Sequence, residues 1–164
     1  QHEANNLHFY LHDMRLPLMI NYFDYAFNFF TSFGYFDTQR EHNNSIRSIA
    51  QSLHQKGLLV IDFFNVILAE KNIIAYQSIT KQDITFNITK WSDESHIYKQ
   101  IEFTDPATQE NFIHREKVAK FTLDNFKTMF SANQLRIKEV FGDYELNSFN
   151  PEISPRLIII AEKE

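Results

Sequence analysis

The sequence has 164 residues, of which 43% are hydrophobic and 23% charged, a balance typical of one globular domain rather than of a disordered chain. Its formal net charge of −5 argues against a nucleic-acid binder, and no apolar run approaches the roughly 20 residues of a membrane helix. The absence of cysteine excludes disulfides, thiolate metal sites and cysteine nucleophiles, and it favours the cytoplasm.

Two apolar runs open the chain. They predict buried strands over Leu7–His12 and Phe23–Phe30. The segment between them contains Pro17 and is too short for a crossover helix, so it is predicted to be a loop.

A helix and a central strand are predicted next. Apolar residues fall at helical spacing from Ile46 to Leu53, and this periodicity predicts a helix over 38–56 with Gly57 as its C-terminal stop. The run Leu58–Phe64 does not alternate, as expected of a parallel strand covered on both faces. A strand, a helix and a parallel strand in succession indicate a right-handed crossover unit.

The second half of the chain changes character. From residue 84 onward isoleucine and phenylalanine alternate with polar residues, which predicts half-buried strands, and 104–110 has the composition of a hairpin turn. Residues 73–121 are therefore predicted to form an antiparallel meander inserted in, or laid over, the α/β part. The remaining elements are a helix and two strands, predicted at 122–133, 136–144 and 155–162.

Glycine is scarce in this sequence. Average usage of about 7% corresponds to roughly 11 glycines, but only Gly34, Gly57 and Gly142 occur, and they are isolated from one another. The sequence therefore contains no glycine-rich phosphate loop and no dinucleotide fingerprint. The 17 phenylalanines and seven tyrosines predict an aromatic-rich core or an aromatic-lined pocket.

Five segments occur in an order that is shared with one enzyme family. From Leu7 onward they are DMR, FDYAFNFFTSFGYF, KGLLVIDFFN, FGDYE and SPRLIIIAEK. This order resembles the class I S-adenosylmethionine-dependent methyltransferases, in particular the small-molecule enzymes. The resemblance implies an α/β fold, a partial Rossmann-like methyltransferase sheet with an antiparallel C-terminal hairpin and an inserted antiparallel β-meander. It also implies one methyltransferase-like domain over 1–164, with S-adenosylmethionine as the methyl donor of the full-length protein.

The sequence departs from that family at its start. Members begin with a strand and an acidic, glycine-rich loop, followed by a second strand whose carboxylate holds the donor's ribose, and neither is found here. Because Gln1 is not an initiator methionine, we expect the chain to be an N-terminally truncated fragment of a longer protein. Without those neighbours a strand at 7–12 has unpaired edges. We therefore expect residues 1–22 either to pair with another chain, as in a homodimer, or to take a position unlike the family's.

The resemblance assigns five residues to the donor site. Asp13 matches the aspartate that accepts a hydrogen bond from the adenine amino group, and Met14 matches the residue whose amide contacts the ring. Asn28, Phe29 and Phe30 occupy the strand end beside the donor's sulfonium, where an aromatic face stabilises a cation. The residues alone are also explained by a turn aspartate and by core phenylalanines.

Further residues are candidates for the acceptor pocket. Residues 31–35 match a loop that shapes this pocket in the family. The insertion and the final hairpin supply further candidates, and α/β folds place ligands at strand ends. The candidates are Ser32, Phe33, Tyr35, Asn65, Trp91, Arg115 and Tyr144. Gly34 in the same loop is predicted to permit a backbone turn. Each candidate also has an ordinary structural explanation in a loop, cap or core.

Two charged residues leave alternatives open. Asp62 interrupts an apolar strand, and a buried carboxylate needs a partner, so it is either an acceptor-site residue or a brace for neighbouring backbone. Arg156 either meets the acceptor or pairs with Asp143 or Glu152. The seven histidines have no metal-ligand spacing, so we expect no catalytic metal, and no catalytic base is identified.

Two functions remain in competition. The first is S-adenosylmethionine-dependent methyl transfer to a small-molecule acceptor, without nucleic-acid or membrane partners. The second is a non-catalytic ligand-binding or protein-interaction domain of α+β type, whose meander over 73–121 forms a cup for an apolar ligand. The order of the segments favours the first, and the missing glycine-rich loop favours the second.

Overall fold

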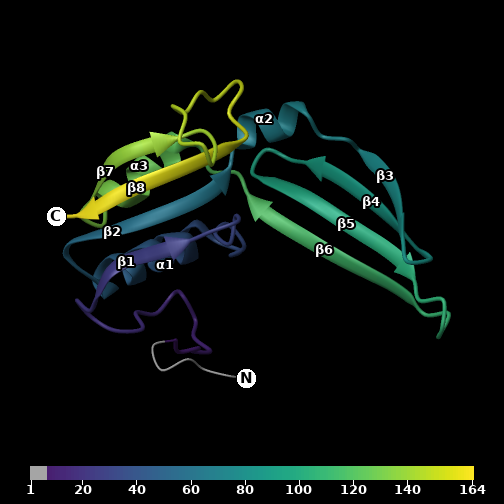
Figure 1. The fold of residues 1–164 in the computed structure, drawn as a ribbon, viewed down its shortest axis with the longest axis horizontal. Helices are drawn as coiled ribbons and strands as arrows, with labels where there is room; N and C mark the ends of the chain where they lie inside the picture. Colours follow the sequence, from purple (N-terminus) through teal and green to yellow (C-terminus); the bar gives the residue numbers. More distant parts are fainter. Residues whose placement is uncertain (1–6) are drawn as a thin grey trace.

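Two four-stranded sheets make up most of the structure, a computed structural model that describes residues 7–164 (Figure 1). A mixed sheet has the strand order β1-β2-β8-β7, and an antiparallel sheet has the order β3-β4-β5-β6. The predicted α/β part and antiparallel meander are both confirmed. The elements are β1 (Phe23–Asn28), α1 (Gln39–Ser52), β2 (Leu53–Phe64), α2 (Val66–Lys71), β3 (Tyr76–Lys81), β4 (Ile84–Ser92), β5 (His96–Thr104), β6 (Asn111–Ala119), α3 (Leu123–Ser131), β7 (Leu135–Phe141) and β8 (Arg156–Lys163).

The crossover unit of β1, α1 and β2 is confirmed. β1 and β2 pair in parallel, and α1 begins with a capping box in which the Thr38 side chain accepts a hydrogen bond from the Glu41 amide. The helix ends at Ser52 rather than at residue 56 because β2 begins directly at Leu53. Gly57 therefore lies inside the strand, where the register of β1 and β2 is irregular, and not at a helix end.

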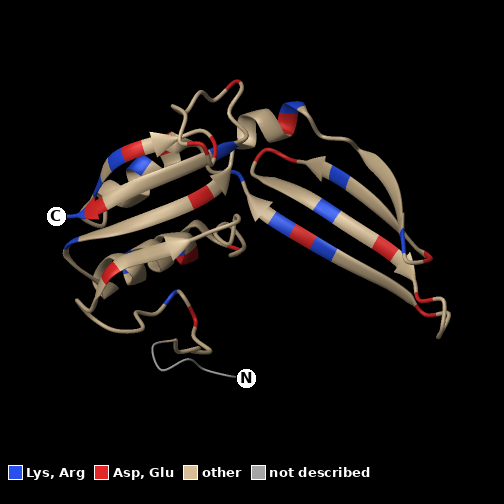
Figure 2. Ribbon diagram, viewed as in Figure 1, with Lys and Arg blue, Asp and Glu red and all other residues tan. Residues whose placement is uncertain are grey.

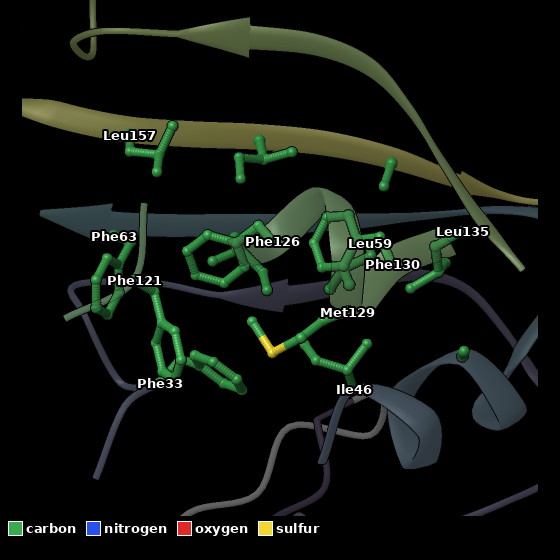
Figure 3. Packing of buried hydrophobic residues seen from close by; sticks show 14 of the residues in the cluster. Phe33, Ile46, Leu59, Phe63, Phe121, Phe126, Met129, Phe130, Leu135 and Leu157 are labelled. Atoms are coloured by element: carbon green, nitrogen blue, oxygen red, sulfur yellow. The ribbon is translucent and has the colours of Figure 1, made fainter. Parts of the chain in front are cut away.

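The hydrophobic core lies between one face of the mixed sheet and the helices α1 and α3 (Figure 3). Ile46 of α1 and Phe126 and Phe130 of α3 are each 0% exposed. They pack with Leu59 and Phe63 of β2, which alternate onto the same face of the sheet. The apolar residues whose helical spacing predicts the first helix are thus the ones with which α1 contributes to the core.

The opposite face of the mixed sheet is open at β1. Tyr25 and Phe27 are 60% and 58% exposed, and their rings stack with centroids 6.2 Å apart. The prediction that this strand is buried is therefore wrong for that face. The cause is that α1 and α3 both pack on the other face of the mixed sheet, so within residues 7–164 no helix lies against Tyr25 and Phe27.

Residues 7–22 form no strand. The strand predicted over 7–12 is wrong: these residues are exposed, and no described strand lies beside them to complete their backbone hydrogen bonds. The loop predicted before β1 is confirmed, and the Asn21 and Tyr22 amides donate to carbonyls at the end of α1. Nothing in residues 7–22 supports the predicted homodimer, and residues 1–6 of that segment lie outside the described residues.

The antiparallel sheet projects away from the mixed sheet and has two different faces (Figure 1). Residues directly paired across strands share a face. The face that we call the inner face includes Ile88, Lys90, Ile97, Lys99, Ile101, Glu116 and Val118. The outer face includes Thr89, Trp91, Tyr98, Gln100, Arg115 and Lys117.

His42 of α1 is buried in a cage of aromatic rings. It is 2% exposed, and its ring centroid lies 4.8 Å from that of Phe121, 5.3 Å from that of Phe33 and 5.4 Å from that of Phe36. Neither ring nitrogen has a hydrogen-bond partner among the described residues. Burial lowers the pKa of His42 from its usual 6.5, so the folded protein holds the neutral ring.

We expect the free energy of unfolding to fall as the pH drops below about 6.5, because the unfolded chain then binds a proton at His42 that the folded chain excludes. The substitution His42→Phe should remove this part of the pH dependence. Urea unfolding at pH 7 and pH 5.5 measures it, with the exposed His54→Phe as the matched control. An unchanged pH dependence in His42→Phe would show that this interpretation is wrong.

Candidate functional site

A cavity of about 460 Å³ lies where the two sheets meet. We call it the inter-sheet cavity. Its lining comes from the carboxyl ends of the parallel strands, from α2 and from the antiparallel sheet, mainly its inner face. The carboxyl ends of parallel strands are the place where α/β folds bind ligands. The lining residues are Thr31, Tyr35, Phe64, Asn65, Leu68, Ala69, Asn72, Ile73, Lys90, Ile97, Tyr98, Lys99, Glu116, Val118 and Pro155.

Asn65 fixes the floor of this cavity. It is the N-cap of α2, and its side-chain oxygen accepts a hydrogen bond from the Ile67 amide at 3.2 Å. Its amide nitrogen donates to the carbonyls of Pro151 and Ser154 at 2.7 and 2.8 Å. The predicted candidate Asn65 therefore lines the cavity, but its polar atoms are already used to join β2, α2 and the loop before β8.

Gly34 and Tyr35 connect the two sheets. Gly34 has a φ of +101°, which confirms the predicted backbone turn, and its carbonyl accepts a hydrogen bond from the Ala119 amide at 2.8 Å. Tyr35 follows directly and lines the cavity. Burial, and then the charge of Glu116, raise the pKa of the Tyr35 hydroxyl, so Tyr35 is a protonated hydrogen-bond donor at neutral pH.

A buried ion pair braces the end of β1 beside the cavity. Asp62 of β2 is 1% exposed, and its carboxylate lies 2.6 Å from the Arg156 guanidinium. It also accepts hydrogen bonds from the Tyr144 hydroxyl at 3.0 Å and from the Phe30 amide at 2.9 Å. Asp62 is thus the predicted brace of neighbouring backbone, and Arg156 pairs with Asp62 rather than with Asp143 or Glu152.

The brace supports an unusual turn. Phe30 and Thr31 follow β1 with φ values of 58° and 60°, in the left-handed region that non-glycine residues rarely adopt. Such a conformation costs roughly 1–2 kcal/mol per residue. The Thr31 amide donates to the Asp62 carbonyl at 3.0 Å, and Arg156 donates to the Thr31 hydroxyl at 3.2 Å. Backbone held in such a conformation marks a position that is set by its surroundings, as functional sites often are.

The residues predicted for the methyl donor lie in two places. Asn28, Phe29 and Phe30 stand at the carboxyl end of β1, and the Asn28 side-chain oxygen is buried without a hydrogen-bond partner in the described residues. Asp13 is exposed and paired with Arg15 at 2.7 Å, and hydrogen bonds from Arg15 lower the pKa of Asp13 to about 2. Met14 packs against the core.

The remaining predicted acceptor residues separate from the cavity. Phe33 belongs to the core at 1% exposure, and the Ser32 hydroxyl donates to the Phe29 carbonyl. Trp91 and Arg115 lie on the outer face of the antiparallel sheet, where Trp91 stacks on Tyr98 and Arg115 bonds to Gln100. Tyr144 belongs to the Asp62 brace. The structure brings only Tyr35 and Asn65 of these candidates to the cavity.

The three charged residues of the cavity were missed by sequence reasoning. Lys90, Lys99 and Glu116 lie on the inner face and line the cavity. The signal was available, because the alternation that places Ile88 and Ile101 inward also places Lys90 and Lys99 inward.

Two other classes of site do not occur in the part of the chain that the structure describes. Residues 7–164 contain no group of three histidine, aspartate or glutamate side chains placed to hold a metal ion. None of the described helices has the length and apolar character needed to cross a membrane.

Several solved structures that match this fold are methyltransferases. An S-adenosylmethionine-dependent methyltransferase from Clostridium acetobutylicum ATCC 824 matches with a TM-score of 0.79 and 12% identity, over 93% of this chain and 63% of its own. The CcbJ methyltransferase from Streptomyces caelestis matches with a TM-score of 0.77 and 13% identity, over 94% of this chain and 66% of its own. The sugar N-methyltransferase KedS8 from Streptoalloteichus sp ATCC 53650 matches with a TM-score of 0.70 and 13% identity, over 93% of this chain and 61% of its own.

This chain resembles the three structures in its fold and not in its sequence. No protein-family model matches the sequence, and no curated protein matches it. The chain has the fold of the class I S-adenosylmethionine-dependent methyltransferases over 93% of its length, which confirms the predicted fold class. It spans less than two thirds of the length of each of the three structures named above.

Proposed function

We propose that this chain takes part in S-adenosylmethionine-dependent methyl transfer to a small molecule, with the inter-sheet cavity as the acceptor site. The observation that carries the proposal is the position of the cavity, at the carboxyl ends of β1 and β2 in a methyltransferase fold. Thr31 lines this cavity and directly follows the strand end that carries the donor candidates. Donor and acceptor would therefore meet at one turn of the chain.

The donor end of β1 fits the proposed methyl donor. The buried oxygen of Asn28 lacks a hydrogen-bond donor in the described residues and suits a ligand that presents an N–H or O–H group. Phe29 and Phe30 are 44% and 78% exposed at the same strand end and offer aromatic faces to a cation. When bound, S-adenosylmethionine supplies a methyl group on a sulfonium. The role of these residues is to bind and orient it.

The acceptor site contributes to methyl transfer by positioning the acceptor molecule. Methyl transfer requires alignment of the acceptor atom with the methyl group, and a rigid, water-poor pocket supplies it. Phe64 and Leu68 give the cavity an apolar wall, and Tyr35 supplies a hydrogen-bond donor. We assign no catalytic base.

A second candidate function is ligand binding without catalysis. It is favoured by one observation, that the three glycines of this sequence are isolated and form no glycine-rich donor loop. In this case the inter-sheet cavity binds the same small molecule, and no methyl group is transferred. The experiment below separates the two functions.

Incubation of the full gene product with methyl-tritiated S-adenosylmethionine and a metabolite extract should place the label in a small molecule. Leu68→Arg puts a long charged side chain into the cavity and should reduce transfer by about 10²-fold. Ile113→Arg, at a residue that is 61% exposed on the outer face, is the matched control and should retain activity. Label in macromolecules alone, or full activity of Leu68→Arg, would contradict the proposal.

A further inference from the structure

Two lysines face each other on the wall of the inter-sheet cavity. Lys90 of β4 and Lys99 of β5 are directly paired across the strands, so their side chains leave the sheet side by side on the inner face. Both line the cavity and both are half-buried. Like charges in this position repel each other and destabilise the strand pair unless an anion lies between them.

Only one carboxylate among the lining residues is available to these two lysines. Glu116 of β6 is paired with Lys99, with 3.3 Å between the charged groups. The same carboxylate lies 3.8 Å from His114. Lys90 has no ion pair within residues 7–164, and the lining of the cavity therefore carries one positive charge in excess. Figure 2 shows the basic bands of β4 and β5 next to each other, with an acidic band on β6 beside them.

Most of the remaining wall around these charges is apolar. Phe64, Leu68 and Ile73 line the side of the cavity that belongs to the mixed sheet and α2, and Ile97 and Val118 flank the lysines on the inner face. The side chains of Lys99 and Glu116 are only 34% and 33% exposed, so their charges are screened less than those of surface residues. The cavity thus combines an apolar body with one charged end.

We propose that the inter-sheet cavity binds a singly charged organic carboxylate with an apolar body, whose carboxylate lies at Lys90 and Lys99. The one excess positive charge calls for a ligand with one negative charge, and the apolar wall calls for a ligand with an apolar body. The inference rests on the proposed function, in which the ligand that carries this carboxylate is the methyl acceptor. It makes Lys90 a specificity-determining residue for that acceptor.

The test compares two probes of the same shape by calorimetry on the full 164-residue chain. Naphthalene-2-carboxylate should bind about fivefold more tightly than the uncharged naphthalene-2-carboxamide, as expected of one half-exposed ion pair. This preference should shrink as the salt concentration rises. Equal affinities, or no binding of the carboxylate, would overturn the proposal.

Two matched variants locate the charge that produces the preference. Lys90→Gln should lower the affinity for the carboxylate to that for the carboxamide, whereas Lys117→Gln, on the outer face of the same sheet, should leave the preference unchanged. A preference that survives Lys90→Gln would overturn the proposal. S-Adenosylhomocysteine is titrated into the full gene product in parallel. If the carboxylate binds and S-adenosylhomocysteine does not, the carboxylate site stands and the methyl-transfer function falls, and the reverse result rejects the carboxylate site alone.

Discussion

Asp62→Ala should lower the free energy of unfolding by about 3–5 kcal/mol, as measured by urea unfolding. The carboxylate of Asp62 is 1% exposed and accepts hydrogen bonds from Arg156, Tyr144 and the Phe30 amide. Its removal leaves the partly buried Arg156 guanidinium without a counter-charge, and an unpaired buried charge costs more than the lost pair contributed. The turn at Phe30 and Thr31 also loses its anchor, so we expect lower ligand affinity as well.

The double variant Asp62→Ala, Arg156→Met separates the charge from the packing. It should be less destabilised than Asp62→Ala alone, because no unpaired charge remains. Glu152→Ala breaks the exposed pair with Lys71, and it should cost less than about 1 kcal/mol. A double variant as unstable as the single one would show that the ion pair is not what holds this end of β1.

Phe126→Ala should cost about 3–5 kcal/mol of unfolding free energy. Phe126 of α3 is 0% exposed, and its ring centroid lies 5.5 Å from that of Phe63, 5.7 Å from that of Phe33 and 5.8 Å from that of Phe121. These rings come from α3, from β2 and from two loops, so the substitution opens a cavity that no single element can close.

The matched control for this substitution is Phe112→Ala. Phe112 of β6 is 42% exposed and stacks on Phe103 at 5.1 Å. Its loss removes less buried area, and we expect the smaller effect of a half-exposed side chain. Similar losses of stability in Phe126→Ala and Phe112→Ala would contradict the position of the core between α1, α3 and the mixed sheet.

The sequence was most informative where the pattern is local. The helical spacing from Ile46 to Leu53 predicted α1, and the alternation after residue 84 predicted the antiparallel sheet. The α1 boundary was misplaced because Gly57 has two uses in proteins, a helix end and a strand irregularity, and only the pairing with β1 decides between them. α2 was missed because its first residues, Val66–Ala69, resemble a continuation of the apolar run of β2. The N-cap Asn65 was the available signal for it.

Features that depend on pairing between strands far apart in the sequence could not be predicted from the sequence. The partner of Asp62 follows from the register of β2 and β8, which pairs Asp62 with Ile158 and Phe64 with Arg156. No local pattern sets that register. The strand predicted over 7–12 failed for a related reason, because an apolar run forms a strand only where another strand lies beside it.

The candidate site was predicted in part. Tyr35 and Asn65 reach the inter-sheet cavity, while Trp91 and Arg115 lie on the outer face of the antiparallel sheet. Trp91 and Arg115 have the residue types of a binding site, but their side chains leave the sheet on the face away from the cavity. Alternation would have placed Trp91 outside and Lys90 inside.

The most direct test of the methyl-transfer account is a calorimetric titration of S-adenosylhomocysteine into the full gene product. We predict saturable binding at one site per chain, weakened in Asn28→Ala, because Asn28 carries the buried oxygen that lacks a partner at the end of β1. Asn87→Ala, in the antiparallel sheet, serves as the control and should bind like the wild type. Absence of binding to the full gene product would contradict the account and leave ligand binding without catalysis as the function of this fold.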